Sequence, residues 1–194
     1  MGLKTITRKL LGIPNFIYNF ILLKYYQVEY GSNFKVNGRL FCVSNSKRGI
    51  VIGDNVSINS CRGANPIGGD TKTVLFAKGN AKLKIGDNVG MSNVTIFACE
   101  SITIGNNVFL GGGVKIYDTD FHWLDYDRRI AEPGGITKPV TINDGAFIGA
   151  HTIILKGVTI GKKSIVGAGS VVTKDIPDGE IWAGNPARFI RKIG

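Results

Sequence analysis

Aliphatic residues recur at every sixth position along residues 142–177. The first positions of these six-residue units are Ile142, Ile148, Ile154, Ile160, Val166 and Val172. The fifth positions are mostly small: Ala146, Thr152, Val158, Ser164, Ser170 and Ile176. A helix needs apolar residues three and four positions apart, and an amphipathic strand needs alternation, so neither explains a period of six. The pattern instead predicts flat strands joined by corners, three to each turn of a triangular coil, which is a parallel β-helix.

The same repeat appears earlier in the chain, in a less regular form. Ile-Gly-Asp-Asn-Val begins at Ile52 and at Ile85, and Ile-Gly-Asn-Asn-Val begins at Ile104. Glycine and Asn-type residues favour the backbone conformations of tight corners. The interval from Ile85 to Ile104 is one residue longer than three units of six. We therefore expect a small bulge near Ala98–Ser101.

Two stretches interrupt the repeat. The first, Arg62–Lys72, is rich in glycine and polar residues and is expected to be a loop. The second, Tyr117–Pro139, lies between two regular repeat blocks, so it must leave the coil and return. Long loops inside compact domains are usually functional. This one carries His122, Trp123, an arginine pair and five acidic residues, which is a dense set of reactive groups on a repetitive scaffold.

Positive charge is concentrated in the first part of the chain. The 194 residues carry 24 Lys and Arg against 14 Asp and Glu, a formal net charge of +10. Residues 1–50 hold eight of the basic residues and one acid, Glu29. Such a balance favours anionic ligands or a membrane surface. Nucleic acid is disfavoured because no nucleic-acid-binding motif accompanies the charge.

An apolar run, Leu10–Leu23, lies within this basic segment. It is shorter than the roughly 20 residues that a spanning helix needs, and no small-residue cleavage site follows it, as a signal peptide would require. One interpretation is a short helix from about Pro14 to Tyr26, packed on the coil or on a neighbouring subunit. The alternative is an interfacial membrane anchor formed by residues 1–27 with its basic flanks.

The length predicts one domain with appendages. We expect an N-terminal helical and basic segment at 1–35, a β-helix at 36–177 with an excursion loop at 117–139, and a C-terminal tail at 178–194. Three cysteines, Cys42, Cys61 and Cys99, form an odd number without metal-ligand spacing. They indicate a reducing compartment, so we expect a cytoplasmic protein, peripheral at the inner face of the membrane if the anchor interpretation holds.

The arrangement of these segments resembles a known family. Repeats, the sequence Asp-Thr-Asp-Phe-His at 118–122, further repeats, Val-Thr-Lys-Asp-Ile-Pro at 172–177 and Ala-Gly-Asn-Pro-Ala-Arg at 183–188 follow one another. Over residues 50–194 this is similar to the maltose, galactoside and polysaccharide O-acetyltransferases of the hexapeptide-repeat superfamily. The resemblance implies a left-handed coil and a homotrimer. It also implies acetyl-CoA-dependent O-acetylation of a sugar hydroxyl, in surface or capsular polysaccharide or another glycan.

The resemblance also implies roles for individual residues. His122 corresponds to the general base of the family. The coenzyme would lie in a groove between the coils of neighbouring subunits, against residues that match the family's contacts: Phe147, Ala150, Ala168, Thr173, Lys174, Arg188 and Arg191. Residues 1–50 do not match the N-terminal helices of the sugar acetyltransferases, which leaves the choice of acceptor open.

Other assignments remain alternatives. Asp118 and Asp120 either orient His122 or bind the acceptor, or else they cap the loop. Asn93 lies in a repeat that faces the expected acceptor side. His151 occupies a corner position and is expected to be exposed and structural. Lys174 is alternatively a corner lysine, and Arg188 and Arg191 alternatively belong to an ordinary basic tail.

The chemistry of acyl transfer is consistent with these residues. A hydroxyl that attacks a thioester must lose its proton, and imidazole is well matched to that task near neutral pH. No Gly-x-Ser-x-Gly sequence is present, so direct transfer is favoured over a covalent acyl-enzyme. A zinc hydratase needs three histidines, and this chain has only two; no metal is expected. The remaining alternatives are an N-acetyltransferase for an amino sugar or nucleotide sugar and a non-catalytic β-helix, although no outer ladder of Thr or aromatic residues is evident.

Overall fold

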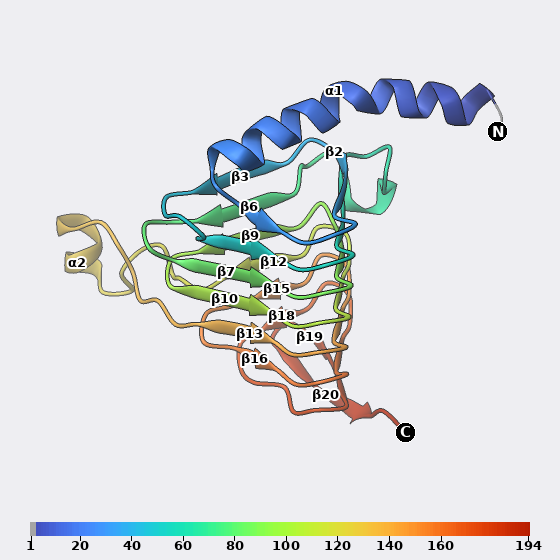
Figure 1. The fold of residues 1–194 in the computed structure, drawn as a ribbon. Coiled ribbons are helices and arrows are strands. Elements are labelled where there is room, and N and C mark those ends of the chain that lie inside the picture. The colour runs from blue at the N-terminus through green and yellow to red at the C-terminus, as the bar shows by residue number, and fades with distance from the viewer. Residues whose placement is uncertain (1–2) are drawn as a thin grey trace.

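The chain winds into a triangular prism of short parallel strands, with one long helix across its amino-terminal end (Figure 1). The computed structural model describes residues 3–194, and side chains from residue 14 onward. Three sheets form the walls, and up to residue 172 each successive strand joins the next wall, so that every third strand returns to the same sheet. The predicted parallel β-helix is confirmed.

The three sheets are named here A, B and C in the order in which the chain visits them. Sheet A contains β1 (Glu29–Tyr30), β4 (Ile50–Ile52), β7 (Lys82–Ile85), β10 (Ser101–Ile104), β13 (Val140–Ile142) and β16 (Thr159–Ile160). Sheet B contains β2 (Lys35–Gly38), β5 (Ser57–Ser60), β8 (Gly90–Ser92), β11 (Phe109–Leu110), β14 (Phe147–Ile148), β17 (Ile165–Val166), β19 (Glu180–Gly184) and β20 (Ala187–Lys192). Sheet C contains β3 (Phe41–Ser44), β6 (Val74–Ala77), β9 (Thr95–Ala98), β12 (Lys115–Tyr117), β15 (Ile153–Ile154) and β18 (Val171–Val172).

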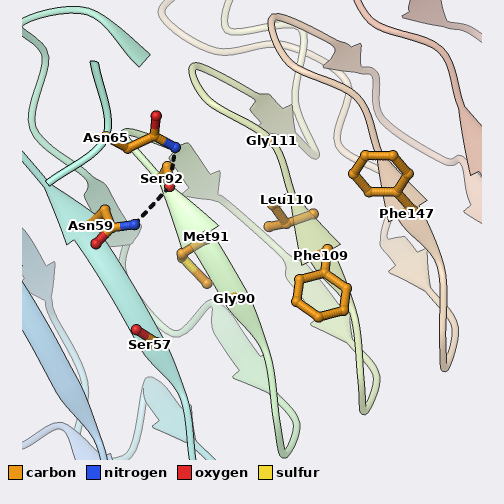
Figure 2. A pocket seen from close by; sticks show the side chains of 10 residues that line it. All are labelled: Ser57, Asn59, Asn65, Gly90, Met91, Ser92, Phe109, Leu110, Gly111 and Phe147. Atoms are coloured by element: carbon orange, nitrogen blue, oxygen red, sulfur yellow. Dashed lines mark hydrogen bonds between the residues drawn. The ribbon is translucent and has the colours of Figure 1, made fainter. Parts of the chain in front are cut away.

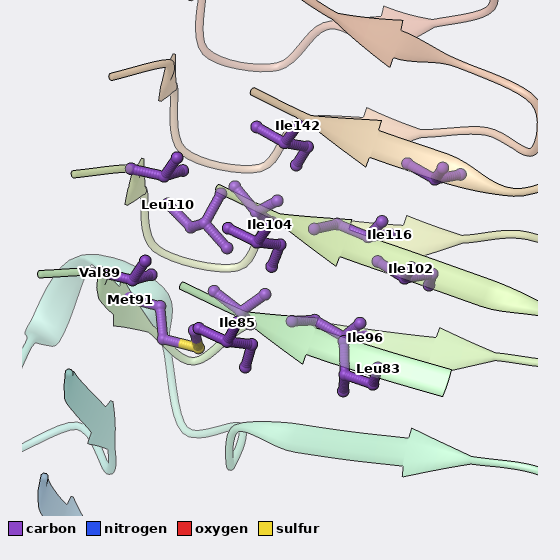
Figure 3. Packing of buried hydrophobic residues seen from close by; sticks show 14 of the residues in the cluster. Leu83, Ile85, Val89, Met91, Ile96, Ile102, Ile104, Leu110, Ile116 and Ile142 are labelled. Carbon is purple, nitrogen blue, oxygen red and sulfur yellow. The ribbon is translucent and has the colours of Figure 1, made fainter. Parts of the chain in front are cut away.

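The interior of the prism is filled by the residues that define the repeat. Every first-position and fifth-position residue of the 142–177 block is buried. Because the coils stack in register, equivalent side chains form columns: Ile85 pairs with Ile104, and Ile104 with Ile142 (Figure 3). Burying branched aliphatic side chains is the main stabilising contribution, at roughly 1.5–3 kcal/mol for each.

The corner between sheets A and B explains the Gly-Asp pair of the repeat. Asp87 Oδ1 accepts a hydrogen bond from Asp54 N of the preceding coil at 2.8 Å. Asn106 Oδ1 accepts from Asp87 N at 2.8 Å, and Asp144 Oδ1 accepts from Asn106 N at 2.7 Å. A Cβ on Gly53 would lie 2.2 Å from Asp87 Oδ1, so only glycine leaves room for this ladder.

A second ladder runs along the same corner. Its members share a left-handed backbone, with φ between +54° and +58°, which asparagine tolerates better than most residues: Asn33, Asn55, Asn88 and Asn107. Each of the first three donates from its side-chain amide to the amide oxygen of the next, at 3.0–3.2 Å. The polar residues between the aliphatic positions therefore join one coil to the next.

Helix α1 (Leu3–Tyr25) begins eleven residues before the expected start at Pro14. Proline favours the first turn of a helix, which suggested a start there, but Pro14 lies inside the helix, where its missing backbone N–H interrupts the hydrogen bonds. The carboxyl-terminal half packs on the coil as the first interpretation predicted. Asn19 Nδ2 donates to Gly38 O at 2.8 Å, and Leu40 N donates to Asn19 Oδ1 at 3.0 Å.

The two ends of the coil differ from the expected boundaries. The coil begins at β1, whose Glu29 and Tyr30 pair with Val51 and Ile52 of β4, rather than at residue 36. The sequence did not reveal this strand because both of its side chains are exposed. The expected C-terminal tail forms β19 and β20, an antiparallel pair that extends sheet B.

Candidate functional site

The excursion loop leaves the prism at the edge between sheets C and A (Figure 1). Its two ends pair with each other and form a stalk: Asp120 N donates to Ile136 O at 3.0 Å, and Thr119 forms an antiparallel bridge with Thr137. Beyond the stalk, α2 (Tyr126–Ala131) is capped by Asp125, whose Oδ1 accepts from Arg128 N at 2.9 Å. The loop is thus an ordered projection.

His122 lies at the top of this stalk and is exposed. Its backbone N donates to Asp120 O at 2.7 Å, and it forms a bridge with Gly134. Gly135 passes so close that a Cβ there would lie 2.9 Å from His122 N. The backbone of His122 is therefore fixed from both strands of the stalk, while no group of the described residues is hydrogen-bonded to its imidazole.

An aromatic cluster anchors the residue before the histidine. Phe121 has a left-handed backbone, with φ +63°, which is unusual for a residue with a side chain. Its ring packs edge-on against Phe97 at 5.1 Å and Tyr117 at 5.4 Å. Phe97 in turn stacks on Phe76 at 4.5 Å. These contacts turn the chain so that Phe121 covers sheet C and His122 faces outward.

Asp120 is held by a lysine from a neighbouring coil. Lys156 Nζ lies 2.7 Å from Asp120 Oδ1, and both side chains are largely buried. The other carboxylate oxygen, Oδ2, is buried without a hydrogen-bond partner among the described residues. Asp120 Oδ2 is therefore still able to accept a hydrogen bond. Both predicted roles of Asp120, binding the acceptor and orienting His122, require such an atom.

Asp118 has a structural function instead. It is fully buried, and its two oxygens accept hydrogen bonds from the backbone N of Cys99, Glu100 and Ser101 at 2.7–2.8 Å. These three residues lie where the sequence predicted a bulge, and the carboxylate satisfies their backbone donors. Both carboxylate oxygens of Asp118 therefore bond to this corner rather than to the excursion loop, and its suggested roles toward His122 or the acceptor stay predictions.

The same C–A edge carries further predicted residues. Thr173 and Lys174 follow β18 at this edge and are exposed. Because the coils stack, Lys156 and Lys174 occupy successive coils below the excursion loop. This edge therefore combines an exposed imidazole, an acidic group and lysines.

A groove of about 380 Å³ lies on the outer face of sheet B (Figure 2). Gly90, Phe109 and Phe147 occupy equivalent positions on adjacent strands, and both rings are exposed, at 60% and 46%. Gly90 leaves a hollow above Phe109, since a Cβ there would lie 3.2 Å from the Phe109 ring. The groove has these lining residues: Ser57, Asn59, Asn65, Gly90, Met91, Ser92, Phe109, Leu110, Gly111 and Phe147.

Polar side chains close one end of the groove. Ser92 Oγ accepts from Asn59 Nδ2 at 3.1 Å and from Asn65 Nδ2 at 2.9 Å (Figure 2). Of the predicted site residues only Phe147 lines this groove; Phe109, Asn59 and Asn65 were missed. Phe109 was recognisable in principle, because Val108-Phe109-Leu110-Gly111 aligns with Ala146-Phe147-Ile148-Gly149.

Asn93 follows Ser92 but does not face the groove. It is buried, and its Nδ2 donates to Thr71 O in the 62–72 loop. A Cβ on Gly68 would lie 2.4 Å from Asn93 Oδ1, so this loop packs directly over the amide. In the chain alone the amide anchors the loop, which does not support a direct contact with an acceptor.

At the corner between sheets B and C, the backbones of successive coils lie close together. Gly111, Gly149 and Gly167 stack in one column, and a Cβ on Gly149 would lie 2.4 Å from Ala168 N. Ala150 and Ala168 follow this column, with Ala168 exposed. His151 is exposed at the same corner with φ +60°, in the location that its corner position predicted. Small residues leave the main chain of this corner accessible to an elongated ligand.

Arg188 and Arg191 lie on β20, at the end of sheet B, and both are exposed. Within the described residues, their side chains donate hydrogen bonds to neighbouring carbonyls: Arg188 to Ala187 O and Arg191 to Lys192 O. The predicted coenzyme residues are thus divided between two regions of the prism. Phe147, Ala150 and Ala168 lie on sheet B and its corner with C, whereas Thr173 and Lys174 lie at the C–A edge.

Neither Cys42 nor Cys99 has an activated thiol. Burial raises the pKa of the Cys42 thiol to about 12. Burial and then the negative charge of Asp118 raise the pKa of Cys99. A raised pKa lowers the thiolate fraction, which is the nucleophilic form. Within residues 3–194, no group of three or more His, Cys, Asp or Glu is arranged to hold a metal ion.

Comparisons with known proteins identify relatives of this architecture. The family model of the hexapeptide repeat of succinyl-transferase matches residues 139–174. Galactoside O-acetyltransferase of Escherichia coli is 40% identical over 122 residues, which cover 62% of this chain and 58% of that protein. The chain spans about half the length of the curated relatives that it matches first.

Two solved structures share the fold over nearly the whole chain. The hexapeptide-repeat acetyltransferase VCA0836 from Vibrio cholerae, in complex with acetyl coenzyme A, is 28% identical with a TM-score of 0.63, covering 96% of this chain and 87% of that chain. A galactoside acetyltransferase in complex with coenzyme A is 26% identical with a TM-score of 0.62, covering 100% and 84%. The predicted left hand of the coil is confirmed by this shared fold.

Proposed function

We propose that this chain is a member of the hexapeptide-repeat acyltransferase superfamily, and that it transfers an acetyl group from acetyl-CoA to a hydroxyl of a sugar. The acceptor is a glycan, such as a surface or capsular polysaccharide. The hydroxyl oxygen forms a bond to the thioester carbonyl carbon, the carbon–sulfur bond breaks, and the proton passes through an imidazole to the departing thiolate.

The observation that carries this proposal is the placement of His122. Its backbone is fixed by Asp120 O and by Gly134, while its side chain is exposed on an ordered projection. A general base must reach the acceptor proton at about 2.6–3.2 Å, so it needs both a fixed position and an accessible nitrogen. His122 meets both requirements.

The acyl donor is proposed to lie along sheet B and its corner with sheet C. The exposed rings of Phe109 and Phe147 offer apolar contact, and the corner next to the Gly149 column offers backbone N–H and C=O groups. Arg188 and Arg191 at the end of the sheet supply positive charge for the phosphates of coenzyme A.

A homotrimer would bring the two halves of the site together. His122 and Lys174 lie on the C–A edge, whereas the groove and Ala168 lie on sheet B and its corner with C. One copy cannot bring its own C–A edge against its own sheet B groove. Closed cyclic packing places one edge of each copy beside another face of its neighbour. We therefore place each active site between two subunits.

Direct transfer is favoured over an acyl-enzyme. The pKa of Cys42 and of Cys99 is raised by burial, so neither thiol is activated. In direct transfer the acceptor hydroxyl attacks while both substrates are bound, and backbone N–H groups at a corner stabilise the developing oxyanion. In this mechanism His122 acts on the acceptor hydroxyl itself, and no side chain of the enzyme carries the acetyl group.

The test is coenzyme A release from acetyl-CoA across sugars, lipid-linked glycans and amino sugars, with the product analysed after mild alkali. An acetyl ester is cleaved by alkali and an acetamide is not. We expect release with a hydroxyl acceptor and an alkali-labile product. An alkali-stable product would replace the proposal with N-acetylation, and no release with any acceptor would reject acetyl transfer.

A further inference from the structure

Helix α1 leaves an apolar face directed away from the coil. Phe16, Ile17, Phe20 and Ile21 are exposed, at 48–70%, and the rings of Phe16 and Phe20 stack at 6.5 Å. Positions i, i+1, i+4 and i+5 lie on one side of a helix. In the sequence, the same spacing of three and four continues toward the amino terminus at Leu3, Ile6, Leu10 and Ile13.

This face is unusual because polar side chains are on the opposite side, against the protein. Asn19 is buried and bonded to Gly38 and Leu40, and Tyr18 Oη donates to Leu40 O at 3.3 Å. A surface helix normally turns its apolar stripe to the core and its polar side to water. Here Leu23 packs on the core, but a second apolar stripe faces outward, and such stripes mark an interaction site.

The surroundings of this face are positively charged. Lys24 is exposed in the last turn of α1, and Lys35, Arg39 and Lys47 are exposed on the first coil beneath it. The only acid of residues 1–50, Glu29, is paired with Arg48. The helix and the coil beneath it therefore carry exposed basic groups that form no ion pair with a described acid.

The position of α1 suits a flat surface. The helix lies across the amino-terminal end of the prism and extends beyond it, while the C-terminal strands lie at the other end (Figure 1). A helix of 23 residues is about 35 Å long. None of the helices in residues 3–194 is long and apolar enough to cross a bilayer. An apolar stripe with basic borders is the arrangement of a helix that lies in the membrane interface.

We propose that α1 binds the surface of an anionic phospholipid bilayer, with its axis in the plane of the membrane and the coil standing upright from it. The stripe enters the boundary between headgroups and acyl chains, and the basic residues contact lipid phosphates. In a trimer whose axis runs along the coils, the three helices would face one plane and bind together, which strengthens a weak single contact.

A second copy of the chain is a less suitable occupant for the same face. Two such ends would bring Lys24, Lys35 and Lys47 of one copy toward the same residues of the other, and like charges repel. An anionic membrane satisfies both the apolar and the charged parts of the surface. The proposal concerns location, so it is independent of which acceptor is acetylated.

The test is co-sedimentation of the full chain with vesicles of phosphatidylcholine alone and of phosphatidylcholine with phosphatidylglycerol, at low and at high salt. The double variant Ile17→Asp/Ile21→Asp removes the stripe, and Lys24→Glu/Lys35→Glu reverses the charge while keeping the stripe. The matched control is Ile130→Asp, since Ile130 is a similarly exposed isoleucine on α2. Thermal unfolding and circular dichroism show whether each variant is folded.

We expect wild type and the control to bind anionic vesicles, more weakly at high salt because exposed charges are screened. Each double variant should lower the partition coefficient at least about tenfold. The proposal is overturned if wild type does not sediment, or if anionic and neutral vesicles bind equally. It is also overturned if Ile17→Asp/Ile21→Asp changes the oligomeric state in light scattering but not vesicle binding, because a second copy then covers this face.

Discussion

Lys156 Nζ lies 2.7 Å from Asp120 Oδ1, which joins the stalk of the excursion loop to the neighbouring coil. The carbonyl of Asp120 also accepts from His122 N at 2.7 Å. One residue therefore connects the proposed base to the rigid body of the prism. The ion pair is thus one of the contacts that hold the stalk of His122 against the coil, together with the packing of Phe121 on Phe97.

The pair is predicted to position His122 rather than to hold the fold. Lys156→Met should lower kcat about tenfold and leave the KM for acetyl-CoA unchanged, because small displacements of a catalytic group are costly. Lys156→Arg, which retains the charge, should recover much of the rate. The matched control is Lys162→Met, an exposed lysine at the A–B corner. A normal kcat together with a lowered Tm for Lys156→Met would assign the pair to stability alone.

Asp118→Asn should destabilise the protein. The amide keeps the shape but replaces one acceptor oxygen with a donor facing the N–H groups of residues 99–101. Losing charge-assisted hydrogen bonds in a buried site should lower the free energy of unfolding by about 2–4 kcal/mol. Chemical denaturation measures this loss.

The control for this change is Asp127→Asn on α2, where the carboxylate is exposed. It should alter the free energy of unfolding by less than about 0.5 kcal/mol. Equal stability of the two variants would show that Asp118 does not hold the bulge.

The coenzyme assignment predicts a change in KM. Arg188→Ala/Arg191→Ala should raise the KM for acetyl-CoA about tenfold with little effect on kcat, because phosphate contacts made equally in the ground and transition states affect binding only. Arg62→Ala is the matched control, since Arg62 is exposed on the 62–72 loop. An unchanged KM in the double variant would assign these arginines to the general charge of the protein.

The period of six was sufficient to predict the coil because every strand contributes an aliphatic side chain to the same interior. Ile148, Val166 and their equivalents must fill one narrow interior, so they recur at a fixed interval. The expectation of a bulge near Ala98–Ser101 has the same basis, since one extra residue breaks the count. The hand of the coil was not determined by spacing and came from the resemblance alone.

Contacts between residues distant in the sequence were not predictable in the same way. The bonds from residues 99–101 to Asp118 depend on the stacking of one coil on the next. Phe76 and Phe97 also stack across coils, so the aromatic row on sheet C was not evident from the sequence. Helix α1 was predicted too short because Pro14 suggested a start, although the spacing of apolar residues continues before it.

The most direct test of the central claim is the rate of acetyl transfer by His122→Ala compared with His151→Ala. Both histidines are exposed, but His151 lies at the B–C corner, away from the excursion loop. General-base catalysis contributes about 10²–10⁴-fold. We predict that His122→Ala lowers kcat by that factor while acetyl-CoA binding and the oligomeric state are retained, and that His151→Ala changes kcat little. Near-normal turnover by His122→Ala, or the reverse behaviour of the two variants, would contradict the account.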